Sequence, residues 1–158
     1  MIIQRVSPTE VTLVSHGTTI QLVDAGFVVN KYSITSPGEY DVAGVAFDVG
    51  IGYALIHVEQ LKVLVIEPSH PQLAAEAVAA IEGVDLVIVP AEADATRRKA
   101  VSNLLNDLEP RGIVVLGGAD DAKAQAGQAI EPVSKLKLVA SDFDGEELRV
   151  WAISPALE

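Results

Sequence analysis

The sequence predicts one mixed domain, of the α+β or α/β class, in which an N-terminal β meander is followed by alternating helices and strands. Short runs rich in β-branched residues fill the chain up to Ile66, as is typical of antiparallel strands. After Ile66 the apolar residues take a helical period and then alternate with short buried runs. No linker, low-complexity tract or internal repeat divides the 158 residues. A single domain, 1–158, is therefore expected.

The first half is expected to contain only strands. Polar clusters at 7–10 and 15–17 separate the first three, because such residues favour turns. Pro37-Gly38 predicts a type II turn, since proline fixes φ at one corner and glycine accepts a positive φ at the next. Turns at 50–52 and 59–61 divide the meander that follows. The predicted strands are Ile2–Val6, Val11–Val14, Thr18–Val23, Phe27–Asn30, Tyr32–Thr35, Val42–Val49, Tyr53–Val58 and Lys62–Ile66.

Helices and buried strands alternate in the second half. The apolar residues of Gln72–Ile81 fall on one helical face, with Ser69 as the N-cap and Gly83 as the stop. Asp94 opens a second helix that runs to about Leu108. The other predicted elements are the strands Val84–Pro90, Ile113–Leu116, Leu136–Val139 and Leu148–Ile153 and a short helix over Asp120–Gln128.

Composition excludes several classes of function. A hydrophobic share of 49% is too high for a disordered chain. The net charge of −11 opposes nucleic acid or an anionic membrane as a partner, because phosphate binding needs clustered Lys and Arg. Cysteine is absent, which removes disulfides, thiolate nucleophiles and Cys-based zinc sites. The start of the chain has no signal-like segment, and no run is long enough to span a membrane, so a cytoplasmic protein is expected.

The segment Ser36–Gly44 (SPGEYDVAG) resembles a strand-turn-strand element of one branch of the metallo-β-lactamase-fold hydrolases. Three further segments, in the same order, are similar to that branch: Gly83–Pro90, Leu108–Val115 and Pro132–Leu138. Together the four segments cover roughly Ile34 to Val150. The resemblance implies a truncated metallo-β-lactamase-like sandwich.

The resemblance also implies a metal site, but its ligands are missing from the matching positions. The family motif His-x-His-x-Asp-His should precede Ser36, where only His16 and Asp24 occur. Glu67–Ser69 stands where a ligand histidine and a bridging aspartate should be, and Gly117–Asp120 stands where the last histidine should be. A catalytic metal usually needs three protein ligands and one open position. The implied protein is therefore a degenerate, non-catalytic member, with no catalytic, cofactor-binding or metal-binding residue assigned.

Relocated ligands are the alternative. His16, His57 and His70 could converge on a metal together with Glu67 or Asp120, and the chain would then be a metal-dependent hydrolase. His57 lies in an apolar strand, where a packed or edge histidine is the more common case. His16 lies in a predicted hairpin turn and His70 at a predicted helix start, where exposure is expected. The pattern thus favours three separate histidines.

Two serine–histidine pairs supply the residue types of a hydrolase triad. They are Ser15-His16 and Ser69-His70, and neither lies in a nucleophile elbow. Residues adjacent in sequence rarely point at each other, so neither pair predicts a nucleophile.

Two further patterns have simpler interpretations. Gly117–Ala119 follows a buried strand and could present N–H groups to an anion. Asp120 and Asp121 place negative charge there, so a plain helix N-cap is favoured. Arg97, Arg98 and Lys99 form the only basic cluster, but consecutive residues fan around a helix, so a solvated flank is expected.

The sequence therefore favours a non-catalytic protein that acts through self-association or through binding another protein. Losing a loop from one end of a sandwich would leave strand edges exposed, and exposed edges tend to pair. A homodimer is the resulting expectation. Its partner, substrate and pathway are not encoded in any motif.

Overall fold

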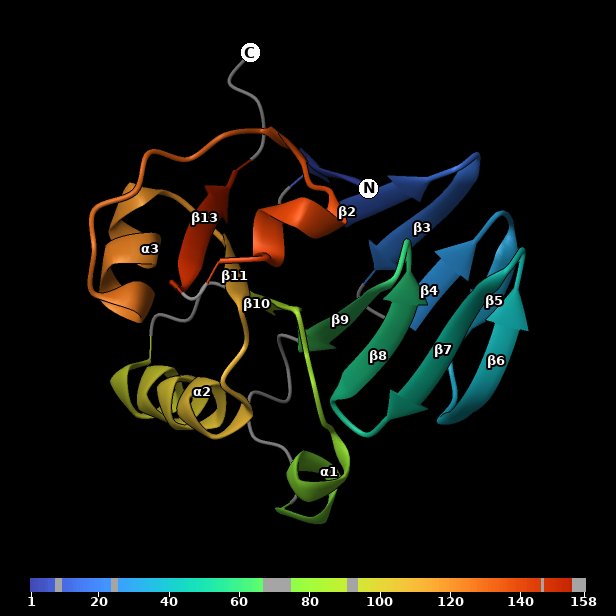
Figure 1. Cartoon of the computed structure of the whole chain (residues 1–158), viewed down its shortest axis with the longest axis horizontal. Helices are drawn as coiled ribbons and strands as arrows, with labels where there is room; N and C mark the ends of the chain where they lie inside the picture. Colours follow the sequence, from blue (N-terminus) through green and yellow to red (C-terminus); the bar gives the residue numbers. More distant parts are fainter. Residues whose placement is uncertain (8–9, 24–25, 67–74, 91–93, 146, 155–158) are drawn as a thin grey trace.

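The structure is a computed structural model that describes residues 1–7, 10–23, 26–66, 75–90, 94–145 and 147–154. Two β-sheets pack face to face (Figure 1). Sheet A has six strands in the order β12-β1-β2-β3-β4-β5, and each neighbouring pair is antiparallel. Its strands are β1 (Ile2–Ser7), β2 (Glu10–Ser15), β3 (Thr18–Val23), β4 (Gly26–Val29), β5 (Tyr32–Ile34) and β12 (Lys135–Lys137).

Sheet B has seven strands in the order β13-β11-β10-β9-β8-β7-β6. Strands β6 to β9 form an antiparallel meander, whereas β9, β10, β11 and β13 are parallel. The parallel strands end together at Ile66, Pro90, Leu116 and Ile153, and we call this side of the molecule the carboxyl edge. The opposite side is the amino edge. The strands are β6 (Gly38–Val42), β7 (Val45–Gly50), β8 (Tyr53–Val58), β9 (Leu61–Ile66), β10 (Leu86–Pro90), β11 (Gly112–Leu116) and β13 (Arg149–Ile153).

The described α-helices pack on the outer face of sheet B. They are α1 (Ala75–Ala80), α2 (Ala95–Leu108) and α3 (Ala119–Ala126). Val101, Leu104 and Ala122 of these helices share one buried cluster with Leu64 and Val87 of the sheet. A short 3₁₀ helix, η1 (Ala140–Phe143), precedes β13. No described helix has the length and apolar character needed to span a bilayer.

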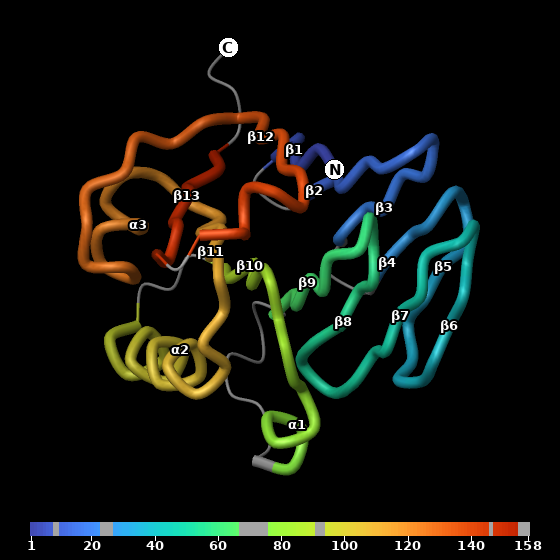
Figure 2. The backbone as a smooth tube through the Cα atoms, viewed as in Figure 1, coloured from blue at the N-terminus to red at the C-terminus, as the bar shows by residue number. Residues whose placement is uncertain are grey.

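A second apolar cluster fills the space between the sheets. Alternate residues of each strand point inward, as the period of two requires, so Ile3, Leu13 and Ile20 of sheet A meet Ile56 and Val63 of sheet B. Strands from opposite ends of the chain complete sheet A, because β12 pairs with β1 (Figure 2). The C-terminal segment thereby joins the two sheets.

Most predicted strands and helices match described elements. Residues 72–74 of the predicted helix Gln72–Ile81 lie outside the described residues, the strand predicted over Leu136–Val139 is β12 at Lys135–Lys137, and residues 38–41 of β6 were not predicted as a strand. Val42–Val49 was predicted as one strand and is wrong: the chain reverses at Ala43 and Gly44, with φ of 53° and 81°, and this turn separates β6 from β7. Gly38 also differs from prediction. It begins β6 after a bend at 36–37 and has φ of 150°, whereas a type II turn needs about +80°. The predicted N-cap Ser69 lies outside the described residues.

Candidate functional site

The carboxyl edge is the place where the family resemblance puts a metal. The described part of this edge contains the segment after β11 and the ends of β1 and β13. Two of the positions considered as ligands, Asp24 and Glu67, lie outside the described residues, as does His70. The chemistry of this edge must therefore be read from the groups around Arg5, Gly118 and Asp121.

Arg5 is the positive group at the carboxyl edge. It follows Met1 and Ile3 on the inward-facing row of β1, and both of these are buried. Its Nη1 atom donates to the Ile153 carbonyl at 3.3 Å, at the end of β13, and its Nε atom donates to the Ser7 carbonyl at 3.4 Å. Burial lowers the Arg5 pKa, and the Asp121 carboxylate partly offsets this. A guanidinium remains charged at any ordinary pH, so a fixed cation stands between the two sheets.

The Gly117–Asp120 segment starts α3 and does not present a histidine. The Gly118 N–H donates to the Asp121 Oδ2 atom at 3.0 Å, so a side chain of the same helix already accepts from this turn. Asp120 is exposed beside it. The anion-binding interpretation therefore loses support to the N-cap interpretation, because two carboxylates occupy the positive end of the helix.

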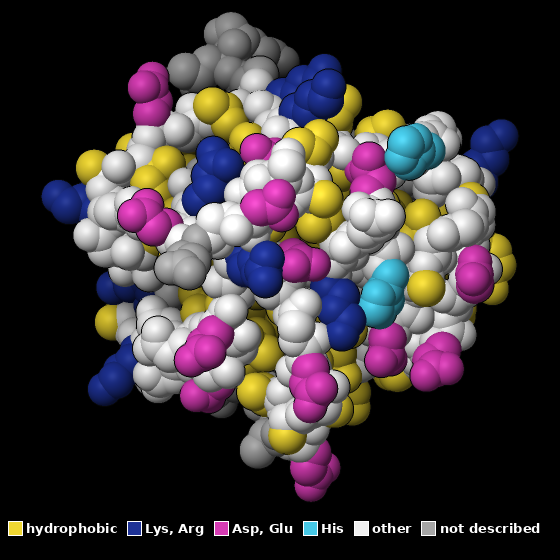
Figure 3. All heavy atoms as spheres, in the orientation of Figure 1, with side chains coloured by type: hydrophobic (Ala, Val, Ile, Leu, Met, Phe, Trp, Pro, Cys, Tyr) yellow, Lys and Arg dark blue, Asp and Glu magenta, His cyan; other side chains and the backbone are white. Residues whose placement is uncertain are grey.

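His16 and His57 come from different elements, and both are exposed. The histidine side chains visible in Figure 3 lie on one face but do not touch each other. His16 is in the β2–β3 turn at the amino edge, with 83% of its side chain exposed. His57 points outward from β8 into a shallow groove that Glu39, Asp41 and Asp48 also line. Among the residues that the structure describes, no group of three or more His, Cys, Asp or Glu side chains could hold a metal. The relocated-ligand hypothesis finds no assembled site in this part of the chain.

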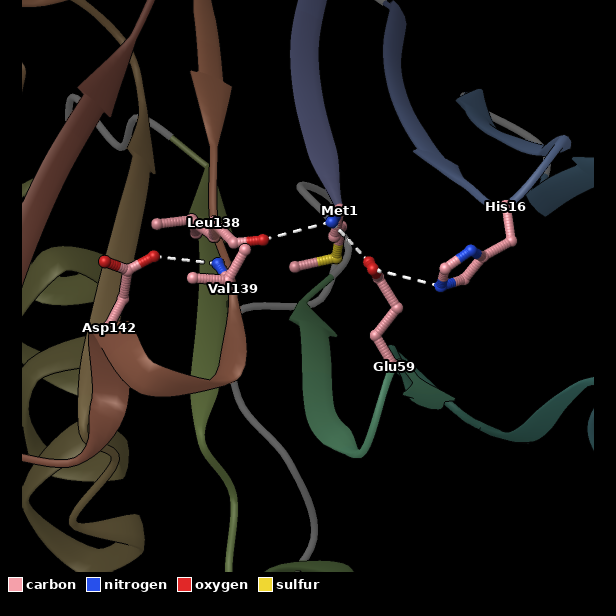
Figure 4. A network of polar contacts seen from close by, with 6 residues as sticks. All are labelled: Met1, His16, Glu59, Leu138, Val139 and Asp142. Carbon is pink, nitrogen blue, oxygen red and sulfur yellow. Dashed lines mark hydrogen bonds and ion pairs between the residues drawn. The ribbon is translucent and has the colours of Figure 1, made fainter.

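A charged network closes the amino edge (Figure 4). The Met1 ammonium is buried, donates to the Leu138 carbonyl at 3.0 Å and forms an ion pair with Glu59. Glu59 also lies 3.3 Å from the His16 Nε2 atom. The ammonium hydrogen bond is the main cause that lowers the Glu59 pKa; burial opposes it, while the Ser15 hydroxyl and the charges of the ammonium and His16 lower it further. This network ties sheet A to the β8–β9 turn of sheet B.

The remaining sequence candidates do not form a catalytic group in the described residues. Ser15 is buried beside Glu59, and the largely exposed His16 faces the same carboxylate, so the pair is not arranged as nucleophile and base. Ser69 lies outside the described residues. Arg97 and Lys99 are exposed on α2 and Arg98 is half-buried between them, as expected for a helix flank.

Comparison with known proteins gives one informative result. No family model and no curated protein matches the chain. A crystal structure at 2.00 Å from Thermotoga maritima does match, and it is described as a candidate Zn-dependent hydrolase of the metallo-β-lactamase superfamily. The alignment covers 98% of this chain and 99% of that chain, with a TM-score of 0.70 and 18% sequence identity. This chain has a metallo-β-lactamase-like fold. The fold class predicted from the sequence is confirmed.

Sequence reasoning missed several residues that the structure brings together. Glu59 was placed only in a turn, although both Glu59 and Gln60 have positive φ, at 50° and 66°. Arg5 was placed only within a strand. The alternation of Met1, Ile3 and Arg5 with Ile2 and Gln4 does indicate that Arg5 points inward, and that signal was available.

Proposed function

We propose that this chain is a non-catalytic protein with a metallo-β-lactamase-like fold that acts by binding protein, including a second copy of itself. The Arg5 guanidinium at the carboxyl edge is the observation that carries this proposal. A divalent cation placed beside a fixed positive charge in a partly dry site is repelled. The nearby Asp121 carboxylate interacts electrostatically with Arg5 and accepts from the Gly118 N–H.

The outer face of sheet A supports the binding part of the proposal. The described α-helices pack with sheet B, and none of their residues joins the buried cluster that involves sheet A. The outward side chains of sheet A are exposed or partly buried: Ile2, Gln4, Val14, Thr19, Gln21 and Val28, with the charged Glu10, Lys135 and Lys137 on the same face. Val6 and Tyr32 are each 53% exposed beside it. Such a surface suits contact with another protein.

Charge indicates which strand edge could pair in a homodimer. Strand β6 ends sheet B and carries Glu39 and Asp41 outward. Two copies of β6 side by side would bring like charges together, which is unfavourable. Strand β5 ends sheet A and carries no ionisable carboxylate or amine between Tyr32 and Ile34. Self-association is therefore expected through β5 or the outer face of sheet A.

Two measurements on tag-free protein test the proposal. Elemental mass spectrometry after incubation with zinc or manganese and mild desalting should find substoichiometric metal. Light scattering at high micromolar concentration should find a dimer, and Tyr32→Glu should shift it toward monomer while Glu39→Gln should not. A stoichiometric metal content would overturn the non-catalytic assignment. A monomer at every concentration would remove self-association and leave only a foreign protein as partner.

A metal-dependent hydrolase is the second candidate, and the matching Thermotoga maritima structure is the observation that favours it. On this hypothesis the bound metal would be zinc or manganese, and a chelator would abolish hydrolase activity. His57→Ala and His16→Ala would separately test whether the described histidines contribute. Retention of full metal content in both variants would assign the ligands to other residues.

A further inference from the structure

A pocket lies at the amino edge, away from the position of the family's metal. It has a volume of about 870 Å³, within the usual range for small-molecule sites. Its described walls come from the C-terminal half of α2, the last turn of α3, and Asp144, Gly145 and Leu148 near the start of β13. Leu105, Ile113 and Leu148 supply apolar surface, and Leu148 is 50% exposed.

Gln125 is the unexplained group in this pocket wall. Its side chain is only 8% exposed. The Nε2 atom donates to the Arg98 carbonyl at 3.3 Å and to the Ser102 hydroxyl at 3.0 Å. The Arg98 carbonyl can only accept, so it fixes which side of the amide is the NH₂ group. The Oε1 atom is therefore an acceptor. It is buried and has no hydrogen-bond partner among the residues that the structure describes, which is unfavourable unless a donor reaches it.

The electrostatics of the pocket favour a positively charged donor. Helices α2 and α3 both follow parallel strands from the carboxyl edge, so both C-terminal ends, with their partial negative charge, face the pocket. Glu109 and Asp144 add two carboxylates to the lining. Arg111 is the one cation in the described lining, and its Nη1 atom is already bound to the Phe143 carbonyl at 2.9 Å.

We propose that this pocket binds a small organic cation, an amine or guanidinium group carried on an aliphatic chain. The charged end would lie near Glu109 and Asp144, and the chain would contact Leu105 and Leu148. The Gln125 Oε1 atom is covered in this structure, so the side chain would have to turn toward the pocket to accept from the ligand. The ligand is either a free amine or the side chain of a peptide, since both present the same chemistry. The inference is independent of the proposed function, because the pocket is at the opposite edge from Arg5 and requires neither a metal nor a dimer.

Calorimetric titration with agmatine and with a capped peptide containing one arginine tests this inference. Agmatine alone binding would assign a free amine, and tighter binding of the peptide would assign a peptide side chain. Gln125→Met should weaken binding about tenfold or more, because a hydrogen bond to a charged donor is lost. Asp144→Asn and Glu109→Gln should each weaken binding several-fold, and they keep the test valid if Gln125→Met unfolds.

Asp107→Asn is the matched control. Asp107 is an exposed carboxylate on the same helix, and it does not line the pocket. Its removal should leave binding unchanged. Equal weakening by Asp107→Asn and Asp144→Asn would overturn the proposal, because binding would then reflect only the net charge of −11. No binding of either probe at millimolar concentration would also overturn it and would assign the Gln125 acceptor to a buried water.

Discussion

Two cations lie at the two ends of strand β1, and their surroundings differ. The Met1 ammonium at the amino edge is buried, with the Glu59 carboxylate against it. The Arg5 guanidinium at the carboxyl edge is only partly buried, and the contacts it makes with Ser7 and Ile153 are to backbone carbonyls. A buried charge needs a paired and hydrogen-bonded partner, whereas a partly hydrated one does not.

The two cations are therefore expected to have different roles. The Met1 ammonium stabilises the fold, whereas the Arg5 guanidinium opposes metal binding at its edge. At the amino edge, charge pairing joins the two sheets and Leu138, so its loss should appear as reduced stability. At the carboxyl edge, the charge of Arg5 interacts with that of Asp121. Replacing Arg5 should change the affinity of this edge for metal ions more than it changes the free energy of unfolding.

Replacing Glu59 with Gln should give the largest effect. The Met1 ammonium would stay buried without its counter-charge, and we expect the free energy of unfolding at pH 7 to fall by about 2 kcal/mol. A broken buried pair usually costs more, but the Met1 ammonium keeps its hydrogen bond to the Leu138 carbonyl. Urea unfolding at pH 7 measures the loss.

Glu76→Gln is the control for that variant. Glu76 is an exposed carboxylate on α1, so its replacement removes the same charge from the surface. It should change stability by less than about 0.5 kcal/mol. A similar loss in the two variants would show that the Met1–Glu59 pair has no special role.

Acid should weaken the wild-type protein through the same pair. The Glu59 pKa is lowered in the folded state, so its contribution is complete above the unfolded carboxyl pKa of about 4.3. That contribution is lost as the pH falls through the lower, folded pKa. Unfolding free energies measured from pH 6 to pH 3 should therefore converge for wild type and Glu59→Gln. Parallel curves would mean that the Glu59 pKa is not lowered in the folded state.

Arg5→Gln should have a smaller effect on stability and a distinct effect on metal binding. We expect a loss of about 1 kcal/mol, because the contacts at 3.3 and 3.4 Å are long and the group is partly hydrated. Affinity for manganese or zinc should rise, since the fixed positive charge is gone. Equilibrium dialysis compares the two proteins, with Arg149→Gln, an exposed arginine, as control. Unchanged affinity in Arg5→Gln would contradict the role given to this guanidinium.

Local signals were enough to predict most of the fold. The strand runs, the N-cap at Asp94 and the alternation after Ile66 are all encoded within a few residues, and Asp94 does accept from the N–H groups of Thr96 and Arg97. The missed turn at Ala43-Gly44 lies inside a valine-rich stretch that imitates one long strand. Its glycine was visible, but the apolar residues on both sides outweighed it.

The groups that matter at the two edges depend on long-range contacts. Met1 and Leu138 are joined across nearly the whole chain, and no local pattern indicates that pairing. The position of Gln125 also depends on contacts between distant parts of the sequence, because its partners Arg98 and Ser102 come from another helix. Histidines, by contrast, are readily identified in a sequence as possible metal ligands. In the structure His16 and His57 are exposed and separate.

His16→Asn should have the smallest effect and tests that contrast directly. His16 has φ of 46° and precedes Gly17, with φ of 81°, in the β2–β3 turn. Asn-Gly is the preferred pair for such a turn, because asparagine tolerates positive φ better than other non-glycine residues. With 83% of the histidine exposed, losing its contact with Glu59 should cost little. Thermal unfolding should therefore show unchanged or slightly higher stability, by up to about 0.5 kcal/mol. A clear loss of stability would instead show that the His16 contact with Glu59 stabilises the fold. A loss of bound metal would show that His16 contributes to metal binding.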